Sequence, residues 1–344
     1  MRFKSGQAQG GLFDYQERQE ALSQKATPLD RLNERLDWEL FRTDLEGHLD
    51  YQCGSQGGRT PWCPVLMFKS LVLQKYYDLS EEQTEFQILD RCSFQRFLGL
   101  DVGDPVPDKN SIWTFKERLG EKGLRGCFAL FDEVLRATGL LASRGKIVDA
   151  SFVEVPRQRN TREENVQIKE GQTPEDWSDH PAKLAQKDVD ARWALKNQER
   201  HYGYKNHVKC NAKSKLIEHY TVTDASVHDR QPLVGLLAPE DGRLHGDSAY
   251  RSGKIDAELR RRGMVNFLHE KGHRNHPLTE QQQESNTKKS RVRARVEPIF
   301  GFQVHPMRAN WIRTIGQQRA ERSIGLGNLV YNLFRDVQLG GTMV

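Results

Sequence analysis

The sequence predicts an all-α N-terminal domain followed by an α/β domain. Up to about residue 140, apolar residues recur at helical spacing in short stretches that polar residues, glycines or prolines separate. From Lys146 onward, β-branched segments with partial alternation take over, and these segments alternate with helical ones. A chain of 344 residues is long enough for two such domains, each with its own core.

The N-terminal domain is expected over residues 14–140, after a Gly/Gln-rich stretch, residues 1–13, that we expect to be disordered. Thr27 and Pro28 predict a helix start, because an N-cap residue is followed by proline at the first helical position. Four leucines between positions 29 and 40 then form one stripe. A Gly/Ser-rich loop is expected at 50–61, and further helices at 64–77, 81–92, 93–98, 110–119 and 124–138.

Two of these helices, at 81–90 and 110–119, have two possible roles. They fit a helix-turn-helix-like pair that reads DNA. They fit a dimerisation bundle equally well, and the sequence favours neither.

The second domain is expected over residues 141–340. Its predicted strands are 146–155, 204–211, 216–224, 244–247 and 265–268, and its predicted helices are 229–237, 253–262 and 287–302. This order predicts a mixed five-stranded sheet with flanking helices. A charged, apolar-poor excursion at about 157–200 interrupts it, and a segment of that length inside a domain is usually functional or mobile.

Composition excludes several classes of protein. The longest apolar runs, such as 65–68 and 71–73, are far shorter than the roughly 20 residues of a membrane span, so we expect no membrane association. The five cysteines are scattered without a Cys-x2-Cys pair, which argues against a disulfide framework and a zinc ribbon. The start of the chain has no apolar signal-peptide core. We therefore expect a soluble, cytoplasmic protein.

Positive charge is concentrated near the C-terminus. Residues 251–322 contain 16 basic and 7 acidic residues, a net charge of +9, whereas the whole chain carries +5 and the remainder therefore −4. A cationic region of this kind suits a polyanion such as nucleic acid. A solvated basic surface explains the charge equally well.

Three acidic residues stand in positions suited to metal binding. Asp149 lies in the first strand of the α/β domain, Asp247 ends the fourth strand after Gly246, and Glu297 lies in the middle of the last helix among arginines. Carboxylates from two central strands and a packed helix can converge on one point. Oxygen-only ligands suit Mg²⁺ or Mn²⁺, and a pair of such ions can cleave a phosphodiester.

Eight passages, in one order from about Leu29 to Leu333, resemble the DDE transposases of bacterial insertion sequences, in the insertion sequence five family. Two of them are Gly246-Asp247-Ser248-Ala249-Tyr250 and Tyr331-Asn332-Leu333. The others are residues 58–69, 93–100, 107–111, 147–151, 202–207 and 223–229.

The resemblance implies an RNase H-like catalytic domain behind an N-terminal domain of the insertion-element type. It implies that Asp149, Asp247 and Glu297 are the catalytic, metal-binding triad, with two Mg²⁺ ions per site that Mn²⁺ can replace. The implied partners are DNA, both the terminal inverted repeats and the target, and further copies of the chain, at least a dimer on DNA. The implied location is the bacterial cytoplasm, on the nucleoid when bound to DNA.

Relatives in this family carry a Tyr-x2-Arg-x3-Glu-x6-Lys signature around the last acid. Arg293 and Glu297 keep the central spacing, which would place both on one helix face. The other two positions depart from the signature, since Ser290 replaces the tyrosine and Val304 the lysine.

Two basic residues are candidates for the missing lysine of this signature, and one other acid competes with Glu297 for the third acidic position. Lys289 or Arg308 is a candidate for the missing lysine. Glu284 is a rival third acid, but it lies in the predicted polar linker at 270–286 without a suitably spaced arginine, so the sequence favours Glu297.

DNA contacts are expected mainly from the C-terminal basic region, through phosphates rather than base edges. Lys205 and His207 are two residues apart in a strand and so share a face, either near the scissile phosphate or merely half-exposed. The full set of expected contacts is Arg293, Lys205, His207, Lys289, Arg291, Arg260, Arg261, Arg262 and Arg308.

Two other functions compete with transposition. One is a catalytically silent DNA-binding protein derived from a transposase, against which the three intact acids argue. The other is a metal-dependent nuclease or phosphoesterase, which would not need the large helical domain.

Overall fold

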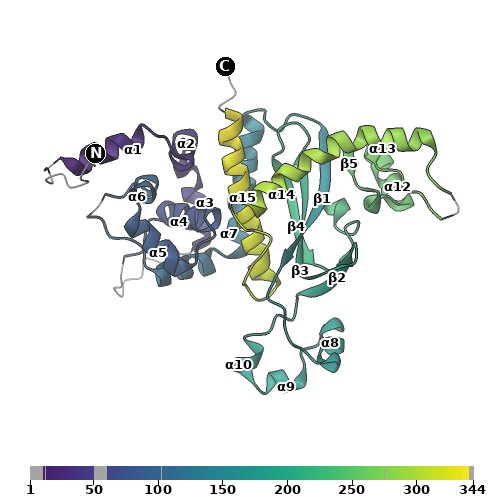
Figure 1. Ribbon diagram of the computed structural model, residues 1–344, viewed down its shortest axis with the longest axis horizontal. Coiled ribbons are helices and arrows are strands. Elements are labelled where there is room, and N and C mark those ends of the chain that lie inside the picture. The colour runs from purple at the N-terminus through teal and green to yellow at the C-terminus, as the bar shows by residue number, and fades with distance from the viewer. Residues whose placement is uncertain (1–10, 12, 50–59, 102, 275, 341–344) are drawn as a thin grey trace, which may run out of the picture.

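The computed structural model describes residues 11, 13–49, 60–101, 103–274 and 276–340 (Figure 1). The stretch predicted to be disordered, apart from residues 11 and 13, lies outside the described residues. So does the Gly/Ser-rich loop apart from residues 60 and 61.

The N-terminal part is helical, as predicted. Its elements are α1 (Asp14–Ser23), α2 (Pro28–Arg35), η1 (Trp38–Phe41), α3 (Arg42–Leu49), α4 (Pro64–Tyr76), α5 (Glu81–Asp90), α6 (Cys92–Leu98) and α7 (Lys109–Ala137). Thr27 caps α2 and Ser80 caps α5, each through a capping box that satisfies otherwise unpaired backbone N–H groups.

The two helices predicted at 110–119 and 124–138 are present, and they meet at a kink within α7. At the kink Gly120 has a φ of 61°, a conformation that glycine adopts without steric cost. Helix α5 packs on α7, where the Glu85 carboxylate accepts the Lys109 backbone N–H at 2.8 Å. Because α6 intervenes in sequence, no short turn joins α5 to α7, and the role of this pair stays a prediction.

The sheet is mixed, as predicted, but it has six strands rather than five. They are β1 (Gly145–Glu154), β2 (Arg192–Lys196), β3 (Glu199–Asn211), β4 (Ile217–Asp224), β5 (Arg243–Gly246) and β6 (Val265–Leu268). Their order is β2-β3-β1-β5-β6, with β4 also paired to β3; β1 is antiparallel to β3 and parallel to β5.

The additional strand, β2, comes from the segment predicted to be an irregular excursion. It pairs only with β3, through a turn at Asn197 and Gln198 that both have positive φ, as in the tight turns of β-hairpins. The same segment holds α8 (Arg162–Lys169), α9 (Glu175–Ser178) and α10 (Pro181–Leu184), packed around the buried side chain of Trp177. The sequence did not predict these helices, because one buried tryptophan and one buried isoleucine are too few apolar positions to form a periodic pattern.

The remaining elements are α11 (Leu233–Leu236), η2 (Ser248–Tyr250), α12 (Gly253–Arg261), α13 (Glu280–Arg293), η3 (Ala294–Val296), α14 (Glu297–Val304) and α15 (Gln317–Gly340). Within the described ranges, none of the helices is long and apolar enough to span a membrane.

The helix predicted at 287–302 is two helices instead. Helix α13 begins earlier, in the predicted linker, where Thr279 and Gln282 form a capping box. It ends at Arg293, and a 3₁₀ turn leads into α14. Pro298 explains the break, because proline lacks an N–H and is tolerated in the first turn of a helix but not in its interior. Glu297 therefore begins a helix and does not lie in the middle of one.

Helix α15, for which no helix was predicted, lies between the helical region and the sheet (Figure 1). It packs on α2, α4 and α7 and also on β4. The Asn332 side chain accepts the backbone N–H of Ile217 at 2.9 Å and donates to its carbonyl at 2.7 Å. One hydrophobic core consequently runs through both parts of the chain, and the domain boundary near residue 140 stays a prediction.

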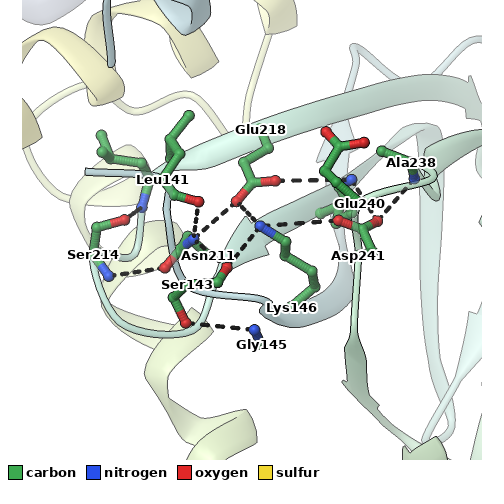
Figure 2. A network of polar contacts seen from close by, with 12 residues as sticks. Leu141, Ser143, Gly145, Lys146, Asn211, Ser214, Glu218, Ala238, Glu240 and Asp241 are labelled. Carbon is green, nitrogen blue, oxygen red and sulfur yellow. Dashed lines mark hydrogen bonds and ion pairs between the residues drawn. The ribbon is translucent and has the colours of Figure 1, made fainter. Parts of the chain in front are cut away.

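Four charged side chains are buried together at the start of β1 (Figure 2). Lys146 Nζ lies 2.5 Å from Glu218 Oε1, and Lys209 Nζ lies 2.7 Å from Asp241 Oδ2. The crossed pairs, Lys146 with Asp241 and Lys209 with Glu218, are 3.9 and 3.8 Å apart. Two positive and two negative charges thus compensate one another and tie β1, β3 and β4 to the segment that precedes β5.

Replacing Lys209, whose side chain is 0% exposed, by methionine should lower the free energy of unfolding by about 3–5 kcal/mol. The substitution leaves Asp241 buried without its closest cation. Lys213→Met is the matched control, since Lys213 is exposed and should tolerate the change within about 0.5 kcal/mol. Urea denaturation monitored by circular dichroism measures both, and an equal effect of the two variants would contradict the buried network.

Candidate active site

Asp149, in the middle of β1, and Asp247, directly after the end of β5, lie side by side on two neighbouring parallel strands. In the register of β1 and β5, Lys146 pairs with Leu244 and Ile147 with His245. Extending that register by two residues places Asp149 beside Asp247, which directly follows β5. Since side chains alternate along a strand, both carboxylates lie on the face of Ile147 and His245.

A glycine allows this close approach of the two strands. A Cβ at Gly246 would lie 2.9 Å from Leu268 Cδ2 and 3.0 Å from Val148 Cγ2, both fully buried. Directly after it, Asp247 caps the short helix η2 by accepting the backbone N–H of Ser248. The predicted motif Gly-Asp-Ser-Ala-Tyr therefore combines a tight strand end with a fixed carboxylate.

Arg293 at the end of α13 reaches into this pair of aspartates. Its Nη2 donates to Asp149 Oδ2 at 2.9 Å, and Asp149 Oδ1 accepts the N–H of Ala150 at 2.9 Å. Burial raises the pKa of the Asp149 carboxyl, and the charge of Arg293 opposes that shift. Burial also disfavours the charged form of Arg293, but the charges of Asp149, Asp247 and Glu297 outweigh it and raise the pKa of the guanidinium.

Glu297 stands one turn beyond Arg293, exposed, at the first position of α14. It is close enough for its charge to act on Arg293. In the described part of the chain, no three or more His, Cys, Asp or Glu side chains are close enough together to hold a metal ion. The structure thus gathers two acids and an arginine, with the third acid beside them.

Lys205 and His207 are engaged inside the fold. Lys205 Nζ pairs with Asp229 at 2.9 Å and donates to the Val227 carbonyl at 2.8 Å. His207 is fully buried beside Thr223, and burial lowers its pKa to about 4, so it is neutral at pH 7.

The other predicted DNA contacts differ in how free their charges are. Lys289 lies 3.2 Å from the Glu270 carboxylate and donates to the Leu268 carbonyl at 3.0 Å. On α12, Glu258 pairs with both Arg261 and Arg262, while Arg260 donates to the backbone carbonyl of Asp256 and has no acidic partner in the part of the chain that the structure describes. Within the described ranges, Arg291 and Arg308 are exposed and have no acidic partner.

The acids that neutralise these cations were missed at the sequence level. Asp229 is 24 residues from Lys205, and Glu270 is 19 residues from Lys289. Asp229 lies in a passage shared with the transposase family, which was the available signal. Glu270 lies in a polar segment whose pattern gives no indication of a partner.

Comparison with known families identifies the class of protein. Residues 16–118 match the family described as Transposase domain (DUF772), and residues 141–333 match the family described as Transposase DDE domain. The second match alone spans more than half of the chain. The chain therefore belongs to the DDE transposases, which generally use divalent metal ions.

The family and the mixed sheet with its flanking helices confirm the predicted architecture: an RNase H-like catalytic domain behind a helical region. The narrower assignment to the insertion sequence five family stays a prediction. One solved structure similar to the chain is described as a piggyBac transposase synaptic complex with hairpin DNA. Its sequence is 10% identical, and the TM-score is 0.45 over 88% of this chain and 74% of that chain.

Gly246→Ala should destabilise the protein by about 1–3 kcal/mol, because the added methyl group has no room between Leu268 and Val148. Gly301→Ala is the control, since a Cβ at that position of α14 meets nothing within 4 Å. There alanine should be neutral or stabilising by up to about 1 kcal/mol. Thermal unfolding of the two variants distinguishes these outcomes, and equal melting temperatures would contradict the packing at Gly246.

Proposed function

We propose that this transposase binds the ends of an insertion sequence, cleaves the DNA strand there and joins it to target DNA in a metal-dependent reaction. The observation that carries the proposal is the placement of Asp149 and Asp247 around Arg293, in a chain that belongs to the DDE transposases. Glu297, one turn beyond Arg293, is the third acid that we assign to the site.

The donor chemistry of these residues fits a hard divalent ion. Asp149, Asp247 and Glu297 offer carboxylate oxygens, which Mg²⁺ prefers in proteins. When two Mg²⁺ ions, or Mn²⁺ in their place, are bound, they supply an activated water or 3′ hydroxyl and charge stabilisation at the leaving oxygen.

We assign Arg293 one role in the DNA-free protein and another in the complex with DNA. Its ion pair with Asp149 compensates the charge of two neighbouring carboxylates. Its Nε is buried and has no hydrogen-bond partner among the described residues. This unused donor is suited to a phosphate oxygen, since charge-assisted hydrogen bonds to phosphate are among the stronger ones. We assign Arg293 to orienting the scissile strand at the carboxylates.

Other DNA contacts follow from the free charges. Arg291 and Arg308 are exposed without acidic partners, so phosphates can neutralise them without breaking an ion pair. Lys289, Arg261 and Arg262 would first have to leave Glu270 or Glu258. We expect Arg291 and Arg308 to contribute more to DNA affinity than these three paired residues.

A second candidate function, a silent DNA-binding protein, has one observation in its favour. Arg293 occupies an oxygen of Asp149 that a metal ion would need. A protein of this kind would bind element ends and leave them intact with Mg²⁺ or Mn²⁺, whereas the proposed transposase would nick them.

Asp149→Ala, Asp247→Ala and Glu297→Ala should each abolish nicking of a duplex that contains an element end, because each removes a metal ligand. DNA affinity should stay within about threefold of wild type, since basic side chains and not these acids make the phosphate contacts. Nicking assays with Mg²⁺ and Mn²⁺, together with fluorescence anisotropy for binding, measure the two effects separately.

Glu284→Ala is the matched control for the third acid. Glu284 is exposed on α13, like Glu297 on α14, and its loss should leave nicking unchanged. Cleavage within tenfold of wild type by Glu297→Ala, combined with loss in Glu284→Ala, would transfer the third position to Glu284.

The active species on DNA should be at least a dimer, because two element ends have to be joined in a coordinated way. Light scattering of the protein with end-containing duplex should give two or more chains per pair of ends. A complex with one chain and one end that still performs strand transfer would refute this expectation.

A further inference from the structure

A cavity of about 370 Å³ lies where the segment after β1 meets the α8–α10 insertion and the segment before α15. Three parts of the chain that are distant in sequence line it: residues 155–158, residues 183 and 186–188, and residues 313–315. None of these residues belongs to the candidate active site.

The lining of this cavity is positively charged. Arg157 and Arg313 have no acidic partner among the described residues. Lys183 is paired with Asp176, and Lys187 donates to the Arg159 carbonyl at 3.0 Å and to Asn160 Oδ1 at 2.7 Å. The one acid in the lining, Asp188, is 2% exposed and accepts the Tyr204 hydroxyl at 2.9 Å and two backbone N–H groups at 3.0 Å. Its charge is directed into the fold and leaves the cationic groups uncompensated.

Two polar groups in the same lining lack partners. The Thr314 hydroxyl and the Gln158 side-chain oxygen are buried and make no hydrogen bond within the described ranges. Buried polar groups without partners cost free energy, so such a pair in one open cavity points to a ligand that supplies them. The hydroxyl can donate to an anionic oxygen, and the Gln158 amide can do so with its nitrogen turned inward.

The surroundings of the cavity favour a nucleic-acid strand. Trp193 on β2 and Trp311 are 45% and 42% exposed, and Arg157 lies 5.6 Å from the Trp193 ring. Exposed aromatic rings between basic side chains are typical of surfaces that follow a nucleic-acid backbone.

The cavity is separated from the candidate active site by the second half of β1. Val155 is six residues after Asp149, and Val155 N–H still pairs with the Tyr202 carbonyl of β3. Six residues of extended strand span about 20 Å, so a duplex bound at the candidate active site is long enough to reach the cavity as well. A distance of 20 Å corresponds to about six base pairs at a rise of roughly 3.4 Å each.

We propose that this cavity binds backbone phosphates of the DNA substrate about six base pairs from the scissile bond, through Arg157, Arg313 and Thr314. The proposal rests on the proposed function, since it locates a second contact of the same DNA. It assigns the insertion a role in holding DNA rather than in catalysis.

Full-length Arg313→Gln and Arg157→Gln should each weaken binding to an end-containing duplex. Each should also reduce the slope of log affinity against log salt by about 0.9, the loss of one phosphate contact. Binding is measured by anisotropy without divalent metal, so that cleavage plays no part. Arg162→Gln, an exposed arginine of the same insertion that does not line the cavity, is the matched control and should keep the wild-type slope.

Duplex length provides the second arm. Duplexes that extend less than about six base pairs from the cleavage position on both sides should bind wild type and Arg313→Gln equally. Duplexes that extend further than this on one side should bind wild type more tightly than Arg313→Gln. Thr314→Val should weaken binding to the long duplex while leaving the melting temperature of the protein equal or higher, because it removes an unpaired buried hydroxyl.

Unchanged slopes for both arginine variants on long duplexes would overturn the proposal. A second result would also overturn it: inorganic phosphate stabilises wild type but not Arg313→Gln, while the salt dependence of DNA binding by Arg313→Gln stays that of wild type. The cavity would then be a site for a small anion. Failure of the proposed function would give a different result, because wild-type protein would then not nick end-containing DNA in the presence of Mg²⁺ or Mn²⁺.

Discussion

The packing of α15 between the helical region and the sheet is the constraint on which the rest of this structure depends. On one side Asn332 pairs with both backbone groups of Ile217 at the start of β4, as a neighbouring strand would. On the other side Asp336 holds Arg35 of α2 at 2.9 Å, and Arg322 pairs with Glu117 of α7. Because one helix is bound to both parts, the helical region cannot move as a separate body without exposing the shared core. Residues 331–333 of the family resemblance are therefore explained by packing and not by chemistry.

Strand β1 carries two kinds of charged group, and the difference between them explains where function can reside. Lys146 is buried in a network in which each charge has an opposite neighbour within 4 Å. Asp149, three residues later and so on the opposite face, has Arg293 as its ion-pair partner, and the Arg293 side chain is 30% exposed. Opening the first network would leave charges uncompensated in a dry interior, which costs several kcal/mol. The second pair lies at the surface, where a metal ion or a phosphate can replace either partner.

Patterns of neighbouring residues correctly predicted the elements that depend on neighbouring residues. The capping box at Ser80, the hairpin at 204–224 and the short strand at 265–268 all depend on residues within a few positions of one another, and all are present. Strand β2 was missed because its stability comes from pairing with β3, and its own side chains Trp193 and Leu195 stay largely exposed. The break before Glu297 was missed even though Pro298 was a local signal, because the run of basic residues suggested one continuous helix.

The sequence by itself determined the order of a helical region and a mixed sheet, and it put Asp149 and Asp247 at strand positions where carboxylates can meet. These features follow from short-range periodicity and from motifs. Only the tertiary structure decided which charges are free, because Arg293 and Asp149 are 144 residues apart and Lys205 finds Asp229 through a turn of the chain. It also decided that Arg157 and Arg313 line one cavity. Ion pairs and cavities arise from strand register and helix packing over long separations, which no pattern of neighbouring residues encodes.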